Sequence, residues 1–374
     1  MNNPEDARGD IAGLQRAIDD SKFDAVLIVS PENLRYATDT PLTSQIKIRD
    51  RLTVIVWARG RAPIMVVCLV WEALVRRHSW IGDLRTYREF HQRPTALVAE
   101  VLRELKLEGG RIGYEGEYLG GLYCDELRAA LPGIRLEHCD ELLQRVRVFK
   151  TPREVETLRH AYRGTANALL ATFSTTRPGQ TERSISRRLA DSIMGSGAEA
   201  VTTLIFGAGA NTGLHMEATD YRVQSGDILK SDCGGHYHGY FSNVGRTAKL
   251  GALNDEDRSV WRRLREIQHA LAGMLRPGVS GREIYERCAH MHQARELPFA
   301  FGHNGHGVGL MIHERPLIAP HEQMVYEAGM VSTVETRVRW PGKVGYHVED
   351  LYLVTEGAPV LLSDAFDNEE ILVV

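Results

Sequence analysis

Short apolar runs alternate with amphipathic segments along the first 148 residues. The runs DAVLIVS (24–30), LTVIVWA (52–58) and APIMVVCLV (62–70) are rich in Val and Ile and have the length of strands, whereas DIAGLQRAIDD (10–20) has the apolar spacing of a helix. This alternation predicts an α/β N-terminal domain over residues 1–148.

The pattern changes near residue 150. In KTPREVETLRHA, Thr151 is expected to cap a helix, Pro152 suits its first position, and Glu154 completes a capping box. Two helical segments follow, and then come strand-like segments rich in Gly, His and acidic residues, interrupted by a helical stretch at about 255–295. Hairpins backed by helices predict an α+β second domain over residues 149–374.

Composition restricts the class of protein. The 374 residues carry 45 basic and 49 acidic side chains, a net charge of −4, which gives no electrostatic reason to expect nucleic acid or an anionic membrane as a partner. The five cysteines are scattered without a CxxC pair, which argues against a disulfide framework and fits a reducing cytoplasm. The first residues lack the apolar core of a signal peptide, and no apolar run is long enough to cross a membrane. Small polar or zwitterionic molecules remain possible ligands.

Two hairpins place acidic side chains opposite polar ones. If the turn in SDCGGHYHGYFSNVGRT (231–247) centres on Tyr237 and His238, Asp232 faces Asn243. If the turn in RWPGKVG (339–345) centres on Gly342, Glu335 faces Glu349. Two facing carboxylates repel each other. A shared proton, a nearby Arg or Lys, a bound cation or exposure to solvent would each relieve this repulsion.

A histidine cluster accompanies these hairpins. The segment FGHNGHGVGLMIHERP (301–316) holds His303, His306 and His313. Imidazole combined with carboxylates suits a divalent transition metal such as Mn, Fe, Co or Zn. The glycines match neither GxxxxGK[ST] nor GxGxxG, so a nucleotide site is not expected.

These motifs resemble the pita-bread family of methionine aminopeptidase, Xaa-Pro aminopeptidase, prolidase and creatinase. DCGGHYHGYFSNVGRT is similar to the family's strand pair with two metal-binding Asp residues, GHGVGLMIHE to its histidine segment, and MVSTVET and YHVEDLYLV to the strands with its two Glu ligands. The first domain resembles the N-terminal domain of the creatinase and prolidase branch. The resemblance implies a pita-bread catalytic domain behind that N-terminal domain, and a homodimer.

The resemblance also implies roles for individual residues. The family's metal ligands fall on Asp232, Asn243, His306, Glu335 and Glu349. His215 falls on a histidine that lines the substrate pocket, and His313 on one that steadies the reacting carbonyl. Asn243 stands where the family has a bridging Asp, so a second ion should bind weakly or not at all. Gly302 replaces a histidine that shields the substrate, although His303 lies next to it.

Two hypotheses follow from this set. In the first, a hydrolase resembling Xaa-Pro dipeptidase or aminopeptidase uses one or two divalent ions to activate water against an amide in a small peptide. His306, Glu335 and Glu349 would hold the tight ion, and Asp232 and Asn243 the weak one. In the second, a metal-free enzyme resembling creatinase or ectoine hydrolase cleaves a small zwitterionic amide or amidine. His215 would then act as acid and base, with Glu335 and Glu349 binding the substrate. A catalytically inactive binding module of the same fold is the third reading.

Other residues receive weaker interpretations. Arg49 and Arg51 lie where relatives bring N-terminal-domain residues to the substrate of a partner subunit, so they are candidates for substrate binding. His236 and His238 are expected in an exposed turn, where either could compensate for Asn243. Arg246 is expected to pair with an acid on a neighbouring strand.

Overall fold

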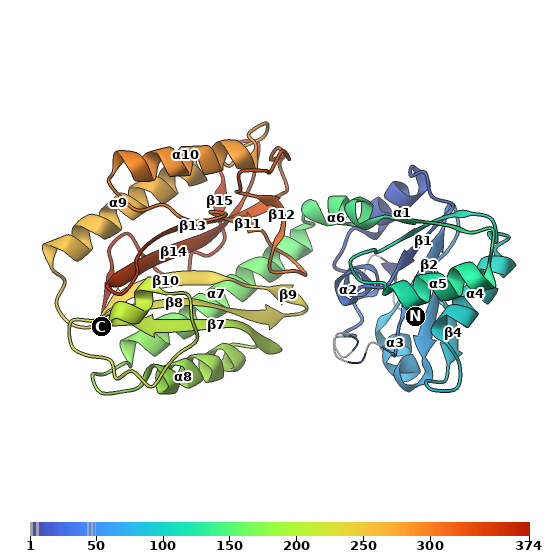
Figure 1. The fold of residues 1–374 in the computed structure, drawn as a ribbon, viewed down its shortest axis with the longest axis horizontal. Helices are drawn as coiled ribbons and strands as arrows, with labels where there is room; N and C mark the ends of the chain where they lie inside the picture. Colours follow the sequence, from blue (N-terminus) through green and yellow to red (C-terminus); the bar gives the residue numbers. More distant parts are fainter. Residues whose placement is uncertain (1–2, 5–6, 43–44, 46–47, 49) are drawn as a thin grey trace. The chain divides into compact units, whose positions relative to one another are not determined.

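The structure is a computed structural model that describes residues 1–374 except 1–2, 5–6, 43–44, 46–47 and 49. The chain divides into two compact units, Met1–Arg147 and Val148–Val374. Each is described by itself (Figure 1).

The N-terminal unit is built on one mixed sheet of six strands in the order β4-β3-β2-β1-β5-β6. The central strands β1, β2 and β3 are buried along their whole length, which explains why their sequences are continuous apolar runs. The strands are β1 (Ala25–Ile28), β2 (Val54–Ala58), β3 (Ile64–Cys68), β4 (Asp83–Tyr87), β5 (Arg111–Tyr114) and β6 (Arg135–His138). The helices are α1 (Ile11–Asp19), α2 (Pro31–Thr38), α3 (Glu72–His78), α4 (Pro94–Glu104), α5 (Gly121–Ala130) and α6 (Asp140–Val148), whose last residue belongs to the second unit.

The second unit contains three sheets. A five-stranded sheet has the order β16-β10-β8-β7, with β9 paired to β8, and two smaller sheets are β13-β14-β15 and β11-β12. The strands are β7 (Ala200–Ala208), β8 (Ile228–Tyr237), β9 (Tyr240–Phe241), β10 (Val244–Lys249), β11 (His306–Gly307), β12 (Glu314–Leu317), β13 (Val331–Trp340), β14 (Val344–Leu353), β15 (Val360–Leu361) and β16 (Leu372–Val373). β10 lies against β14, since the Thr247 hydroxyl donates to the carbonyl of His347 at 2.9 Å.

Two pairs of helices cover these sheets on opposite sides (Figure 1). They are α7 (Pro152–Ser174) and α8 (Glu182–Gly195) beside β7 and β8, and α9 (Asp255–Ala272) and α10 (Gly281–Ala294) beside β13 and β14. One apolar core joins α9 and α10 to the hairpin formed by β13 and β14. Its buried residues include Leu264, Ile267, Ile284, Val334 and Val348. The helices therefore cover the outer faces of the sheets, and the polar residues lie between the sheets.

The start of α7 has the predicted cap. The Thr151 hydroxyl accepts from the amide of Glu154, the Glu154 carboxylate accepts from the amide of Thr151, and Pro152 is the first helical residue. The predicted capping box is confirmed.

The hairpin β13–β14 has the predicted register. Glu335 lies directly opposite Glu349, and Trp340 opposite Val344. Gly342 has φ 75°, a conformation that glycine adopts without strain, so the turn forms where it was expected.

The register predicted for the other hairpin is wrong. Asp232 pairs with Gly245 rather than with Asn243. The turn centres on His238 and Gly239, with φ 52° and 86°, because a two-residue hairpin turn of this kind needs positive φ at both central residues and glycine supplies one of them. Asn243 instead lies in the break between β9 and β10.

The cysteines form no disulfide bonds. All five cysteines are free and buried. None of the helices searched, which cover the described residues only, is long and apolar enough to cross a membrane.

Candidate metal centre

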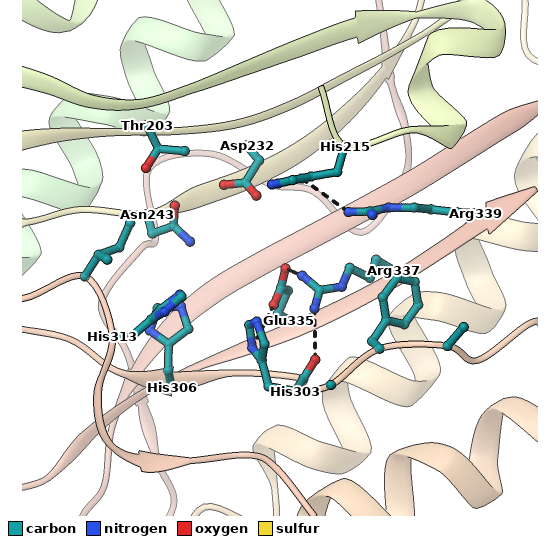
Figure 2. Close-up of a pocket in the computed structure, with 14 residues that line it drawn as sticks. Thr203, His215, Asp232, Asn243, His303, His306, His313, Glu335, Arg337 and Arg339 are labelled. Carbon is teal, nitrogen blue, oxygen red and sulfur yellow. Dashed lines mark hydrogen bonds and ion pairs between the residues drawn. The ribbon is translucent and has the colours of Figure 1, made fainter. Parts of the chain in front are cut away.

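A cavity of about 440 Å³ opens in the second unit where the two hairpins meet the histidine segment (Figure 2). Its wall is polar on most sides. The polar side chains that line it are those of Thr203, His215, Asp232, Asn243, His303, His306, His313, Glu335, Arg337 and Arg339. The structure thus brings together residues from positions 203 to 339.

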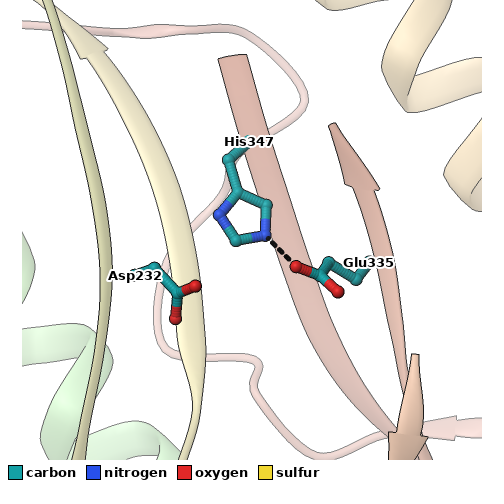
Figure 3. A group of neighbouring side chains, drawn as sticks. All are labelled: Asp232, Glu335 and His347. Atoms are coloured by element: carbon teal, nitrogen blue, oxygen red, sulfur yellow. Dashed lines mark ion pairs between the residues drawn. The ribbon is translucent and has the colours of Figure 1, made fainter. Parts of the chain in front are cut away.

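Three buried side chains from three strands approach one another beside this cavity (Figure 3). Asp232 of β8, Glu335 of β13 and His347 of β14 each offer a ligand atom, and these atoms all lie within 4.8 Å of one another. His347 Nε2 lies 2.9 Å from Glu335 Oε1. The His347 ring lies over Gly245, where a Cβ atom would come within 2.4 Å of it, so glycine at 245 makes room for this histidine.

A second group lies next to the first. Glu349 is fully buried, and the Asn243 amide donates to its two carboxylate oxygens at 3.0 and 2.9 Å. His306 Nε2 lies 3.5 Å from Glu349 Oε1, and His306 Nδ1 lies 2.9 Å from the carbonyl of Gly307. A carbonyl can only accept, so Nδ1 carries the hydrogen of this bond and Nε2 has the free lone pair in that tautomer.

Several of these polar atoms have no hydrogen-bond partner among the described residues. They are Asp232 Oδ1, Asn243 Oδ1, His306 Nε2 and Glu335 Oε2. Buried polar atoms without partners are uncommon because each costs free energy. Oxygen and imidazole nitrogen atoms that converge in this way are the donors that a divalent transition metal takes, so the residues fit such an ion.

Burial and mutual repulsion shape the charges of the centre. Burial, and then the charge of Glu349, raise the pKa of the Asp232 carboxyl well above its usual range. Burial lowers the pKa of Arg337 to about 10, which leaves its guanidinium positive at neutral pH. Arg337 makes a close ion pair with Glu335 Oε1. One of the relief mechanisms predicted for the facing carboxylates, an intruding arginine, is therefore present.

Burial lowers the pKa of three histidines that line the cavity, His215, His303 and His313. Burial lowers the pKa of His303 to about 3 and that of His313 to about 4. Burial, followed by the nearby Arg339, also lowers the pKa of His215. A neutral imidazole donates a hydrogen bond from one ring nitrogen and accepts one at the other. It can therefore hold a substrate carbonyl or carry a proton.

A buried lysine fixes the loop that carries His215. Lys230 Nζ donates to the carbonyls of Thr212 and Leu214, the latter at 2.7 Å. These carbonyls lie at the end of a 3-10 helix (Gly209–Gly213), directly before His215. Arg339 approaches His215 from the other side, with Nη2 3.4 Å from Nδ1 (Figure 2).

The residues predicted from sequence fall into three groups. Asp232, Asn243, His306, Glu335, His215, His303 and His313 line the cavity. Glu349 lies behind it against Asn243 and His306. Arg51 pairs with Glu89 at 2.9 Å inside the N-terminal unit, and Arg49 lies outside the described residues. A substrate-binding role for these two arginines stays a prediction.

The weaker interpretations have mixed outcomes. Arg246 pairs with Asp350 of β14 at 2.6 Å, as predicted. His236 packs its ring against Phe241, with centroids 4.2 Å apart. His238 is at the centre of the turn. Neither is among the residues that line the cavity.

Three titratable residues of the site were missed by sequence reasoning. Arg337 and Arg339 follow Glu335 at two-residue spacing on β13, and His347 precedes Glu349 by two residues on β14. Side chains two apart on a strand share a face. The alternation of strand residues was therefore the signal that could have found them.

Comparison with known proteins identifies the family of this chain. Residues 156–356 match metallopeptidase family M24, and residues 11–149 match the creatinase/prolidase N-terminal domain. The chain belongs to metallopeptidase family M24. This M24 chain is therefore a hydrolase by family, and the family implies a divalent metal. The family match bears out the predicted pita-bread catalytic domain behind a creatinase/prolidase N-terminal domain.

Relatives of the M24 chain extend over nearly its whole length. It is 26% identical to the Xaa-Pro dipeptidase of Pyrococcus furiosus over 353 residues, covering 92% of this chain and 94% of the relative. It is 25% identical to the Xaa-Pro dipeptidase of Lactobacillus helveticus over 348 residues, covering 92% and 93%. The solved Xaa-Pro dipeptidase from Bacillus anthracis has the same fold, with a TM-score of 0.86, 24% identity and coverage of 97% and 99%. These relatives do not favour the metal-free, creatinase-like alternative.

Proposed function

We propose that the protein is a metal-dependent peptidase that hydrolyses the amide bond before proline in a short peptide. The observation that carries this proposal is the convergence of Asp232, His306 and Glu335, with unpaired ligand atoms, on one cavity. Xaa-Pro dipeptidases of similar length and sequence support the choice of substrate. A cavity of about 440 Å³ has the size of a small-ligand site, which suits a dipeptide better than a long chain.

The ion would be held by Asp232, His306, Glu335 and Glu349. Asn243 Oδ1 and His347 Nε2 are further donors within the same group of side chains. A divalent transition ion bound there would lower the pKa of a water molecule and would polarise the scissile carbonyl.

The remaining residues bind the substrate and move its protons. His215 and His313 line the cavity and are neutral, so each can donate an N–H to the carbonyl oxygen of the scissile amide. His303 lines the same cavity and would shield the substrate from water. Arg339 is half-buried in the cavity wall beside His215, where its guanidinium can bind the free carboxylate of a dipeptide.

We further propose a cytoplasmic homodimer. Five buried free cysteines support a reducing compartment. The family resemblance supports the dimer, and analytical ultracentrifugation tests it. A single sedimenting species with the mass of one chain would contradict it.

Hydrolysis of paired dipeptides tests the function. Xaa-Pro and Xaa-Ala dipeptides with the same first residue differ only in the second residue. The ratio of their kcat/KM values therefore measures the preference for proline directly. We expect preference for Xaa-Pro, loss of turnover on chelation, and recovery with Mn²⁺, Co²⁺ or Zn²⁺. Glu335→Gln should abolish the recovery. Equal rates on the paired dipeptides, or turnover that chelation does not change, would contradict the proposal.

A further inference from the structure

Arg337 is held rigidly against the candidate metal centre. It lies on the same face of β13 as Glu335 and directly opposite His347 of β14. Its side chain is buried, Nη1 contacts Glu335 Oε1, and Nη2 donates to the carbonyl of His303 at 2.9 Å (Figure 2). Its guanidinium carbon lies 4.6 Å from the centroid of the Phe301 ring. Contacts on three sides fix the position of this charge.

The ion pair leaves part of Glu335 available. Arg337 contacts Oε1, whereas Oε2 has no hydrogen-bond partner among the residues described. One carboxylate can therefore face the guanidinium with one oxygen and a metal ion with the other. Arg337 and a single ion are compatible on the same glutamate.

The balance of buried charge decides how many ions the centre accepts. Its carboxylates are Asp232, Glu335 and Glu349, all buried, with three negative charges when ionised. Arg337 contributes one positive charge, which leaves two negative charges, the number that one divalent cation neutralises. Two divalent cations would leave an excess of two positive charges, and uncompensated buried charge is strongly unfavourable.

Asn243 acts in the same direction. Its amide contacts Glu349 without adding a negative charge. A neutral residue at this position makes a second cation less favourable.

We propose that the Arg337 guanidinium takes the place of a second divalent cation, so that the centre binds one metal ion per chain. The proposal rests on the proposed metal dependence, and it assigns a positioning and charge-compensating role to a residue that the peptidase hypothesis leaves unused. It also explains why an arginine is buried two residues from a candidate metal ligand.

Metal stoichiometry tests the proposal independently of activity. Metal-stripped protein is loaded with Mn²⁺, and bound metal is measured by elemental analysis and by calorimetric titration. The wild type should bind one equivalent. The double variant Asn243→Asp/Arg337→Met raises the buried charge to four negative units, and should bind two equivalents with the electron paramagnetic resonance signature of two coupled Mn²⁺ ions.

Matched variants separate the charge of Arg337 from general effects. Arg339→Met removes an arginine of the same strand that also lines the cavity but does not contact Glu335, and should leave the stoichiometry at one. Arg337→Lys keeps the charge and should also bind one equivalent. Circular dichroism checks that each variant folds. If the double variant does not fold, Arg337→Gln alone should lower the dissociation constant for a second Mn²⁺ at least tenfold.

The possible outcomes are distinct. Two equivalents in the wild type, a double variant that stays at one, or an Arg337→Gln protein with no tighter second site would each overturn the proposal while leaving the peptidase function standing. No bound metal in the wild type would overturn both.

Discussion

The side-chain amide of Asn243 donates to both carboxylate oxygens of Glu349, at 3.0 and 2.9 Å. Both residues are buried, and this contact directs the amide oxygen of Asn243 away from the carboxylate. Glu349 is therefore stabilised by an uncharged partner before any metal binds. A carboxylate at position 243 would instead repel Glu349, and a bound cation would be needed to stabilise the pair.

Asn243→Asp should make the stability of the protein depend on metal. The new carboxylate would face Glu349 without the two hydrogen bonds, and we expect a loss of roughly 2–4 kcal/mol in the free energy of unfolding without metal. Mn²⁺ should restore more of this free energy in the variant than it adds to the wild type. Urea unfolding with chelator and with Mn²⁺ measures both quantities. Asn243→Ala removes the hydrogen bonds without adding charge, so an equal response of the two variants would contradict the explanation.

Lys230→Met should displace the loop that carries His215. The substitution leaves the carbonyls of Thr212 and Leu214 without their buried donor, which should cost about 1–3 kcal/mol of stability and lower kcat at least tenfold. Steady-state kinetics and urea unfolding measure the two effects. Lys249→Met is the matched control, because Lys249 is a buried lysine of β10 that pairs with Asp257 at 2.7 Å and does not line the cavity. It should lose stability but keep kcat, and an equal loss of kcat in both variants would refute a specific role for Lys230.

Gly245→Ala should displace His347. The added Cβ would lie 2.4 Å from the ring, closer than non-bonded atoms approach, so the ring or β10 must shift. We expect a loss of about 1–3 kcal/mol in stability together with weaker Mn²⁺ binding. Removing the ring in Gly245→Ala/His347→Ala should recover part of the stability but not the metal affinity. Gly121→Ala, where an added Cβ meets nothing within 4 Å, should lower neither property, and a Gly245→Ala variant that matches it would contradict the packing argument.

The stability of the protein should fall in acid, partly because of His292 of α10. This residue is fully buried, with Nδ1 3.0 Å from the carbonyl of Cys288, and burial lowers its pKa below the usual value. In the unfolded chain a histidine titrates near about pH 6.5. Below that pH the unfolded chain binds a proton that the folded protein does not, so the free energy of unfolding falls with pH, by at most about 1.4 kcal/mol per pH unit from this residue.

A pair of histidine variants tests this pH dependence. His292→Gln should flatten the curve of unfolding free energy between pH 5 and 7, measured by urea unfolding at each pH. His290→Gln, on the exposed side of the same helix, should leave the slope unchanged. Identical slopes in all three proteins would show that His292 does not contribute.

The two hairpins show how far sequence reasoning reaches. In RWPGKVG the turn itself holds a single glycine, Gly342, and the register that follows from it places Glu335 opposite Glu349. In GGHYHGY several turn positions are possible, and the predicted one is off by one residue, because Gly239 rather than the centre of the segment decides where positive φ is accepted. That shift moved the partner of Asp232 by two residues, from Asn243 to Gly245. An error in register leaves the set of candidate metal ligands unchanged, but it changes which residues are predicted to lie opposite each other.

The contacts that determine the chemistry of the site come from its tertiary structure. The predicted ligands were recognisable by residue type and by resemblance. The Arg337–Glu335 ion pair and the place of His347 over Gly245 depend on the packing of β13 and β14 against β10. Charge balance in the centre could be judged only after these neighbours were known.

Titration of Mn²⁺ into the metal-stripped protein, with hydrolysis of one Xaa-Pro dipeptide as the readout, tests the central claim most directly. The claim is that one divalent ion, held beside Arg337, activates this hydrolase. The predicted result is a rate that rises linearly with added Mn²⁺ and saturates at one equivalent per chain. Full activity in the stripped protein, or a rate that saturates only at two equivalents, would contradict it.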